Sequence, residues 1–260
     1  ADGRLVVDGD MAAYGARTRS KVEVASVFDP DARVIAAAGR IDGLDVAALP
    51  EATGRPELQT DVTGTYTARL AGDSWTATFA ADESTVGTAT IAGGATIAAR
   101  GRGRSLEAEI GADVRDVSGA LFGVDADETT VAGRIDAAVS IPDLEAPDLL
   151  DTVNGRAHVA LAESVLYGQR VASATVDATV ADGVVDVAAL ELQAPTLTLK
   201  GTGPVAIGPS TTTESALALE GDVPDLAELP EAMTQVSGLR GSARIEATVT
   251  GTASRPAISG

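Results

Sequence analysis

The sequence predicts a mostly β protein: a long antiparallel meander, curled into an elongated groove, with short helical inserts and an internal repeat. Apolar and polar residues alternate over many short stretches, as they do in strands that bury one face. Short breaks with Gly or Asp join neighbouring stretches as hairpin turns. Polar inserts with Pro interrupt the alternation at intervals near 90 residues, which indicates a repeat.

The alternation is clearest at residues 239–250, where Ala243 and Ile245 face one side and Arg244 and Glu246 face the other. The same pattern recurs at residues 21–24, 74–79, 105–110 and 172–180, and it puts Tyr66, Trp75 and Phe79 on the apolar side. Residues 71–73 and 181–183 have the composition of hairpin turns. We therefore expect one face of the meander to be apolar throughout and the other to be polar.

Three inserts each follow a stretch led by a glycine, and these glycines (Gly39, Gly133 and Gly221) are 94 and 88 residues apart. Asp45, Asp143 and Asp225 lie where an N-cap would accept backbone N–H bonds, so each insert is expected to hold one short helix. The approximate repeats are 1–126, 127–214 and a partial 215–260, within one continuous array over 1–260. We expect the array to be a portion of a longer protein.

The apolar content is made of small and aliphatic side chains, because apolar residues are 45% of the chain and aromatic residues only 3%. Closed cores are densely packed by large side chains, and alanine-rich strands fill such a core badly. We expect either very close packing on another layer or an apolar face that the chain does not cover itself. Cysteine is absent, so no disulfide framework is available.

The formal net charge of −19 disfavours nucleic acid and anionic lipid headgroups as surface partners. The sequence has no apolar run of about 18 residues that would span a bilayer. Residues 1–10 lack the basic and apolar regions of a signal peptide, so any export signal is expected outside this segment.

The residues that carry chemistry in enzymes are sparse. His158 is the one histidine in the sequence and falls on a polar strand face, so we interpret it as a surface residue. The acidic stretch of Asp125, Asp127 and Glu128 lacks the spacing of a calcium loop, which favours a solvated turn. Residues 100–104, Arg-Gly-Arg-Gly-Arg, suggest a basic hairpin tip, with contact to a lipid phosphate as the weaker alternative. We predict a non-enzymatic protein without cofactor or metal.

If the apolar face is left open, small aliphatic side chains would line a trough for hydrocarbon chains. The candidate lining positions are Val176, Ala178, Val180, Val185, Val187, Leu190, Leu192, Leu197, Leu199, Leu217, Leu219, Ile245 and Val249. The same residues would form the core of a self-packed sandwich or solenoid, so two interpretations stay open. One is a lipid-binding groove, and the other is a structural β-repeat stalk or adhesin with a filled core.

Two stretches carry a resemblance to a known family. Residues 238–252 (GLRGSARIEATVTGT), followed by 255–260 (RPAISG), combine an alternating stretch that ends in Gly-Thr with a following Pro-containing stretch that ends in Gly. Residues 181–203 form an Asp-Gly hairpin that ends in Gly201 and Gly203, and residues 225–230 (DLAELP) form a short helical insert. These elements resemble the repeats of the AsmA-like superfamily, and within it those of the TamB (translocation and assembly module) type, over residues 33–260.

The resemblance implies a taco-shaped sheet with an apolar concave face. It implies a role in phospholipid transfer between the inner and outer membranes, or in outer-membrane protein assembly. The expected location is the periplasm, with the parent protein anchored in the inner membrane by a segment that this chain lacks. The expected partners are phospholipid acyl chains and, through the parent protein, an outer-membrane barrel protein.

Overall fold

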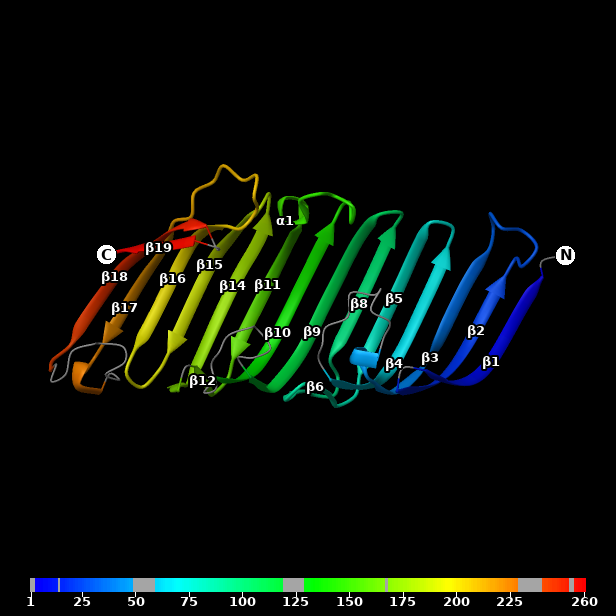
Figure 1. The fold of residues 1–260 in the computed structure, drawn as a ribbon, viewed down its shortest axis with the longest axis horizontal. Coiled ribbons are helices and arrows are strands. Elements are labelled where there is room, and N and C mark those ends of the chain that lie inside the picture. The colour runs from blue at the N-terminus through cyan, green and yellow to red at the C-terminus, as the bar shows by residue number, and fades with distance from the viewer. Residues whose placement is uncertain are drawn as a thin grey trace.

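A computed structural model describes residues 3–13, 15–48, 59–118, 129–166, 168–228, 240–252 and 255–260. The described residues form one sheet of 19 strands that lie side by side across the molecule (Figure 1). The expectation of a mostly β, antiparallel meander is confirmed. The elements that close each hairpin lie along the two long edges of the sheet.

The first ten strands are β1 (Arg4–Ala13), β2 (Ala16–Ala25), β3 (Val34–Leu44), β4 (Thr60–Ala71), β5 (Ser74–Ala81), β6 (Ser84–Val86), β7 (Ala89–Ile91), β8 (Thr96–Arg102), β9 (Ser105–Ser118) and β10 (Thr130–Ile141). The others are β11 (Asn154–Leu161), β12 (Ser164–Leu166), β13 (Gln169–Val171), β14 (Ser173–Ala181), β15 (Val184–Gln193), β16 (Thr198–Ala206), β17 (Leu217–Val223), β18 (Ala243–Thr252) and β19 (Arg255–Ser259). The short helices are η1 (Val46–Ala48), α1 (Leu149–Thr152) and η4 (Leu226–Glu228).

Each long strand pairs antiparallel with the next long strand along the chain. Two small hairpins, β6–β7 and β12–β13, interrupt this order, so that β5 pairs with β8 and β11 with β14. The first hairpin bridges β4 and β9, and the second pairs with β10. The meander therefore continues across both hairpins without a change of direction.

The expected hairpin turns are present. Ala71 pairs with Ser74, and Ala181 pairs with Val184. Asp182 and Gly183 both have positive φ, at 51° and 72°, as a two-residue hairpin turn of type I′ requires. An Asp-Gly pair supplies this conformation with little strain, because aspartate tolerates the left-handed region and glycine has no Cβ.

The predicted helix-capping role is confirmed for Asp45 and Asp225 but not for Asp143. The carboxylates of Asp45, Asp143 and Asp225 each accept the backbone N–H two residues further on, at 2.9–3.0 Å. Short helices follow Asp45 and Asp225 directly. After Asp143 the chain instead forms a turn, in which the N–H of Ala146 bonds to the Asp143 carbonyl, and α1 begins only at Leu149. Figure 1 places α1 on the opposite edge of the sheet from η4, so the inserts are not equivalent in space.

Three bulges keep the apolar residues on one face. A one-residue slip turns every following side chain to the other face of a strand. At each bulge the register shifts by one residue just where the sequence alternation shifts, between Ile41 and Leu44 in β3 and between Val187 and Leu190 in β15. The third bulge, in β9 opposite residues 131–133 of β10, contains Asp116 at a φ of 57°. Each bulge thus keeps the apolar residues that follow it on the same face of the sheet as those that precede it.

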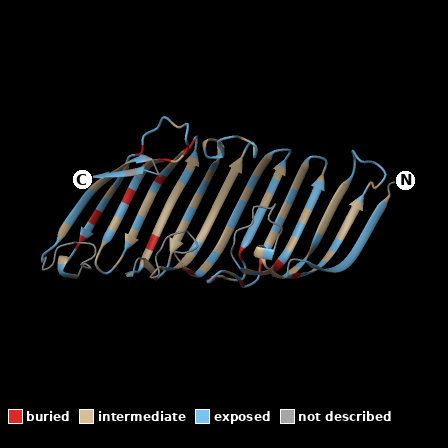
Figure 2. Cartoon of the chain, in the orientation of Figure 1, coloured by how far each residue is buried: buried red, intermediate tan, exposed pale blue. Residues whose placement is uncertain are grey.

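The sheet is a single layer. In the described part of the chain, the substantial contacts of every strand are with its neighbours in the sheet. The accessible surface is 15970 Å² for a mass of 26.0 kDa, whereas a compact protein of that mass exposes about 10,500 Å². Figure 2 shows buried residues only as isolated patches, with most strands intermediate or exposed. No continuous core forms within this layer.

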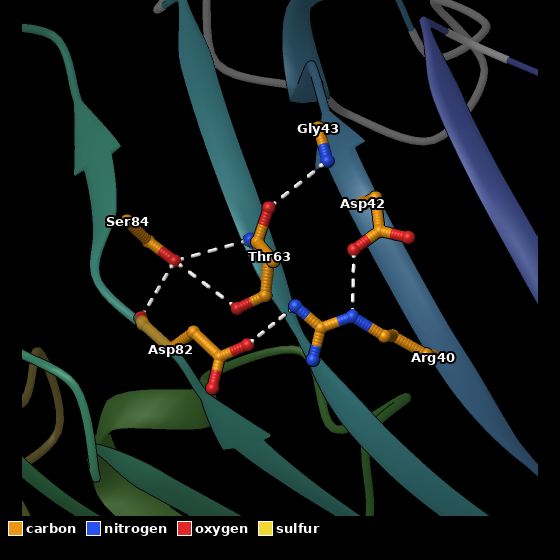
Figure 3. A network of polar contacts seen from close by, with 6 residues as sticks. All are labelled: Arg40, Asp42, Gly43, Thr63, Asp82 and Ser84. Atoms are coloured by element: carbon orange, nitrogen blue, oxygen red, sulfur yellow. Dashed lines mark hydrogen bonds and ion pairs between the residues drawn. The ribbon is translucent and has the colours of Figure 1, made fainter.

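Some of the buried residues lie where the small hairpins meet the long strands, and others lie in β15–β17. The Ser84 hydroxyl, on a side chain only 3% exposed, accepts the N–H of Thr63 at 3.1 Å and lies 3.0 Å from the Asp82 carbonyl (Figure 3). Arg40 completes this network with ion pairs of 2.7 Å to Asp42 and to Asp82. The network fastens the β6–β7 hairpin to β3 and β4.

A second serine repeats the arrangement. The Ser164 hydroxyl accepts the N–H of Ala132 at 3.1 Å and lies 2.9 Å from the Ala162 carbonyl, beside the β12–β13 hairpin. Ser215 accepts the N–H of Ala206 at 2.9 Å. Each serine follows a glutamate, and Glu-Ser occurs only at these three places in the sequence. The Glu-Ser dipeptide thus marks these serine contacts in the sequence, whereas the apolar–polar alternation does not reveal them.

Candidate functional site: the apolar face of the sheet

The strand registers bring the apolar side chains to one common face. Val176 lies opposite Leu190, Val180 opposite Val185, and Leu217 opposite Val249. The other lining candidates that lie in strands fall on the same face: Ala178, Val187, Leu192, Leu199, Leu219 and Ile245. Leu197 lies in the turn between β15 and β16 and not in a strand. Sequence alternation thus identified one shared surface, which we call the apolar face.

A row of alanines crosses five strands of this face, at right angles to the strand direction. Neighbouring strands β3, β4, β5, β8 and β9 place Ala37, Ala68, Ala77, Ala99 and Ala108 directly opposite one another. At about 4.8 Å per strand this alanine row extends roughly 19 Å. The rows on either side, about 7 Å away along the strands, carry mainly large side chains. They contain Tyr66, Phe79, Ile97 and Ile110 on one side and Ile35, Leu70, Trp75 and Leu106 on the other.

The aromatic residues lie flat against the sheet, over glycines of adjacent strands. A Cβ added at Gly101 would lie 2.6 Å from the Trp75 indole nitrogen, and one at Gly64 would lie 2.7 Å from the Phe79 ring. Tyr66 covers Gly39 in the same way, and its hydroxyl reaches Ser20 at 2.6 Å. Aromatic rings that cover strand glycines stabilise a sheet without standing out from it. The face therefore stays shallow where the sequence places its largest residues.

Large aliphatic side chains of this face are open to solvent. Leu70, Ile97 and Ile110 are 42–45% exposed, and Leu5 and Val7 of β1 are 51% and 52% exposed. Among the lining candidates named above, only Ile245 is as exposed, at 46%, whereas Val187 is buried at 8% and the others are partly exposed. Contiguous apolar surface larger than a few hundred Å² marks an interaction site in soluble proteins. The described residues thus carry an apolar surface that no described element covers.

The opposite face, which we call the polar face, is held by ion pairs between neighbouring strands. Arg134 bonds to Asp136 at 2.8 Å and to Asp113 at 3.0 Å, and both carboxylates raise the pKa of its guanidinium. Lys21 and Arg4 lower the pKa of Glu23 through hydrogen bonds to its carboxylate. These groups are exposed, so each pair contributes little to stability, but together they keep the face hydrophilic.

Two hollows lie on the polar face, of about 600 Å³ and 530 Å³. They adjoin across β8–β11 and share Ala98, Glu109, Ala138 and Arg156 as lining residues. The resemblance implied an apolar concavity, whereas these two hollows are lined by polar and charged side chains together with alanines, and three of those alanines (Ala77, Ala99 and Ala108) belong to the alanine row. The apolar face is exposed because no described element covers it, and these hollows do not contribute to that exposure.

His158 and the arginines of residues 100–104, which the sequence singled out, are bonded to neighbouring carboxylates. His158 lies on the polar face, with Nδ1 2.6 Å from an Asp177 carboxylate oxygen. Residues 100–104 form the β8–β9 hairpin, where Arg100 pairs with Glu107, Arg102 with Asp73 and Arg104 with Asp143. Asp125, Asp127 and Glu128 lie outside the described residues. Within the described ranges, no group of three or more His, Cys, Asp or Glu side chains is arranged to hold a metal ion.

Among the residues that the structure describes, no helix has the length and apolar character needed to cross a membrane. No family model matches the chain. Neither a curated protein nor a solved structure matches it.

Proposed function

We propose that the chain is a segment of a periplasmic lipid-transfer protein of the AsmA-like, TamB type, whose apolar face shields acyl chains. The parent protein would support phospholipid transfer between the inner and outer membranes, or outer-membrane protein assembly. The observation that carries the proposal is the apolar face, which runs through every long strand and is uncovered among the described residues. A stalk or adhesin with a filled core would need that face to be packed.

The alanine row suggests how a hydrocarbon chain lies. Alanine leaves a shallow furrow between rows that contain Ile97 and Ile110 on one side and Leu70 and Trp75 on the other. The furrow runs along the hydrogen-bonding direction of the sheet, so a chain placed in it crosses successive strands. Binding requires no polar group, because removal of CH₂ groups from water is favourable by about 0.8 kcal/mol each.

The open geometry sets the strength of binding. A chain lying on an open face loses about half of its exposed surface, so each methylene contributes roughly 0.4 kcal/mol, about half of the full transfer value. A chain of about 16 carbons then gains about 6 kcal/mol, which is of the same order as the entropic cost of association. Single acyl chains should therefore bind weakly and exchange readily. Such behaviour suits a surface that passes lipids along.

A photoactivatable fatty acid, with labelled residues mapped by mass spectrometry, tests the proposal. We expect labels on the apolar-face residues of β3–β9. We expect the double variant Ala77→Asp/Ala99→Asp to lose these labels, because it places two charges in the furrow. The matched control, Thr76→Asp/Thr78→Asp, adds the same charge to the other face of β5 and should label like the wild type. Absence of labelling, or equal labelling of both faces, would favour the structural stalk.

A chain-length series sharpens the test. For an open face, each added methylene should strengthen binding of a fluorescent fatty acid about twofold, whereas an enclosed tunnel predicts about fourfold. A fourfold increment would show that the hydrocarbon is surrounded and would contradict binding on an open layer.

A further inference from the structure

We propose that residues 142–153, which we call the α1 insert, are a docking surface for a basic polypeptide segment that carries apolar side chains. The inference is independent of lipid binding, because the insert lies on an edge of the sheet and not on the apolar face (Figure 1). The insert has the sequence PDLEAPDLLDTV, with four acidic residues and no basic one. It displays three leucines, Leu144, Leu149 and Leu150, with exposed fractions of 44%, 39% and 50%.

The insert is fastened to the β8–β9 hairpin. Arg104, at the hairpin tip, bonds to Asp143 at 3.1 Å and also pairs with Glu145. The N–H of Leu144 donates to the Arg104 carbonyl at 2.9 Å. These contacts hold the backbone of Leu144 and leave its side chain in solvent.

The other end of the insert is fastened to the segment 207–216. The Asp151 carboxylate accepts the N–H of Ser210 at 3.3 Å. It packs against two glycines, since a Cβ at Gly208 would lie 2.0 Å from an Asp151 carboxylate oxygen and one at Gly183 would lie 2.8 Å from it. The N–H of Gly208 in turn donates to the Gly183 carbonyl at 2.8 Å. The leucines are thus presented by a segment that is anchored at both ends, which lowers the entropic cost of binding.

A hollow of about 810 Å³ adjoins one of the leucines, Leu150. Leu150 forms one wall, and Ile207, Pro209 and residues 211–215 form others. The hollow can receive an apolar side chain of a partner, as central pockets of protein interfaces do. Its one charged lining residue is Glu214.

The charges around the leucines define the partner. Glu145 and Asp148 are exposed on the insert, and Asp182 is exposed on the neighbouring turn. Arg104, which holds one end of the insert, is already bonded to two carboxylates of the insert. The surface therefore combines apolar anchors with an acidic rim and complements lysine or arginine beside leucine or phenylalanine. Nucleic acids and anionic lipid surfaces are disfavoured by the same charges.

Two synthetic amphipathic peptides with the same leucine pattern, one with lysines and the other with glutamates, test the proposal on the full chain. We expect the lysine peptide to bind, with fluorescence anisotropy as the readout, and the glutamate peptide not to bind. The variant Leu149→Ser/Leu150→Ser should weaken binding by about tenfold or more, as loss of interface anchors does. The matched control Val6→Ser/Phe28→Ser removes exposed apolar side chains that lie outside both the α1 insert and the apolar face, and it should bind as the wild type does.

Equal losses in both variants would show unspecific apolar adherence and would overturn the proposal, as would no loss in either. Two further outcomes would also overturn it. One is loss of binding to phosphatidylcholine vesicles in Leu149→Ser/Leu150→Ser, which would assign the leucines to a lipid surface. The other is a dimer in sedimentation that this variant abolishes, which would assign them to a second copy of the chain. Urea unfolding midpoints of both variants, expected within error of the wild type, show that the fold is unchanged.

Discussion

The two faces of the sheet share the same strands but hold their side chains in different ways. On the polar face, charged side chains find partners on the same or the neighbouring strand, as Arg134 does with Asp136 of β10 and Asp113 of β9. On the apolar face, Ile97 and Ile110 lie side by side and remain 45% and 42% exposed. Charged groups of the polar face are therefore paired within the layer, whereas among the described strands the apolar face has substantial contacts only in the plane of the sheet. The stability of the layer therefore depends on the backbone hydrogen bonds between strands and on a few buried residues, and not on a continuous core.

The largest expected effect comes from placing a carboxylate on the apolar face, once at a buried position and once at an exposed one. Val187→Asp buries a carboxylate at a site that is 8% exposed, so we expect a loss of about 3 kcal/mol in the free energy of unfolding. Ile97→Asp puts the same charge at a site that is 45% exposed, and its effect should stay below about 1 kcal/mol. Urea denaturation followed by circular dichroism measures both. Equal and large losses would indicate that the face is a closed core.

The serine contacts offer a second test, because they fasten the layer in its own plane. Ser84→Ala leaves the N–H of Thr63 without its partner, and Ser164→Ala does the same for Ala132. We expect each to cost about 1–2 kcal/mol in the free energy of unfolding. Thr67→Ala is the control, since it removes an exposed hydroxyl bond to Thr78. Hydrogen exchange should locate the loss at the small hairpins, and a loss spread evenly over the sheet would contradict the assignment.

The ion pairs of the polar face predict a smaller effect. Arg134→Gln removes contacts to two carboxylates, yet all three groups are exposed. We expect a destabilisation below about 1 kcal/mol that shrinks as salt is raised, because exposed pairs are screened. Thermal melts at low and high salt measure it. A loss that persists in high salt would mean that this pair is shielded from solvent.

Acid pH should reveal the smallest contribution. Hydrogen bonds from Lys21 and Arg4 lower the pKa of Glu23 from its ordinary value of 4.5. A carboxyl whose pKa is lowered by folding stabilises the protein above its ordinary pKa, and this contribution disappears as pH falls through the lowered value. The difference in urea midpoint between the wild type and Glu23→Gln should therefore be present at neutral pH and vanish in acid. A difference that grows in acid would reverse the sign and refute the assignment.

Some elements could be predicted because their cause is local. The Asp182-Gly183 pair specifies its hairpin turn through backbone conformation alone, and the carboxylates of Asp45 and Asp225 cap helices that follow directly. The helix expected at Asp143 begins six residues later, at Leu149, because the local turn and the contacts to Arg104 hold the intervening backbone. That partner comes from another hairpin, so the delay is not readable from the insert itself.

The sequence by itself determined the class of fold and the division into an apolar and a polar face, because side-chain alternation and turn conformation are properties of neighbouring residues. Tertiary structure alone decided which strands lie together, how Ala37, Ala68, Ala77, Ala99 and Ala108 align into one row, and how Ser84 and Ser164 fasten the small hairpins. It also decided that the described apolar face stays uncovered. Register and layering depend on contacts between residues far apart in the chain, and alternation is the same whether a face meets a core or a ligand.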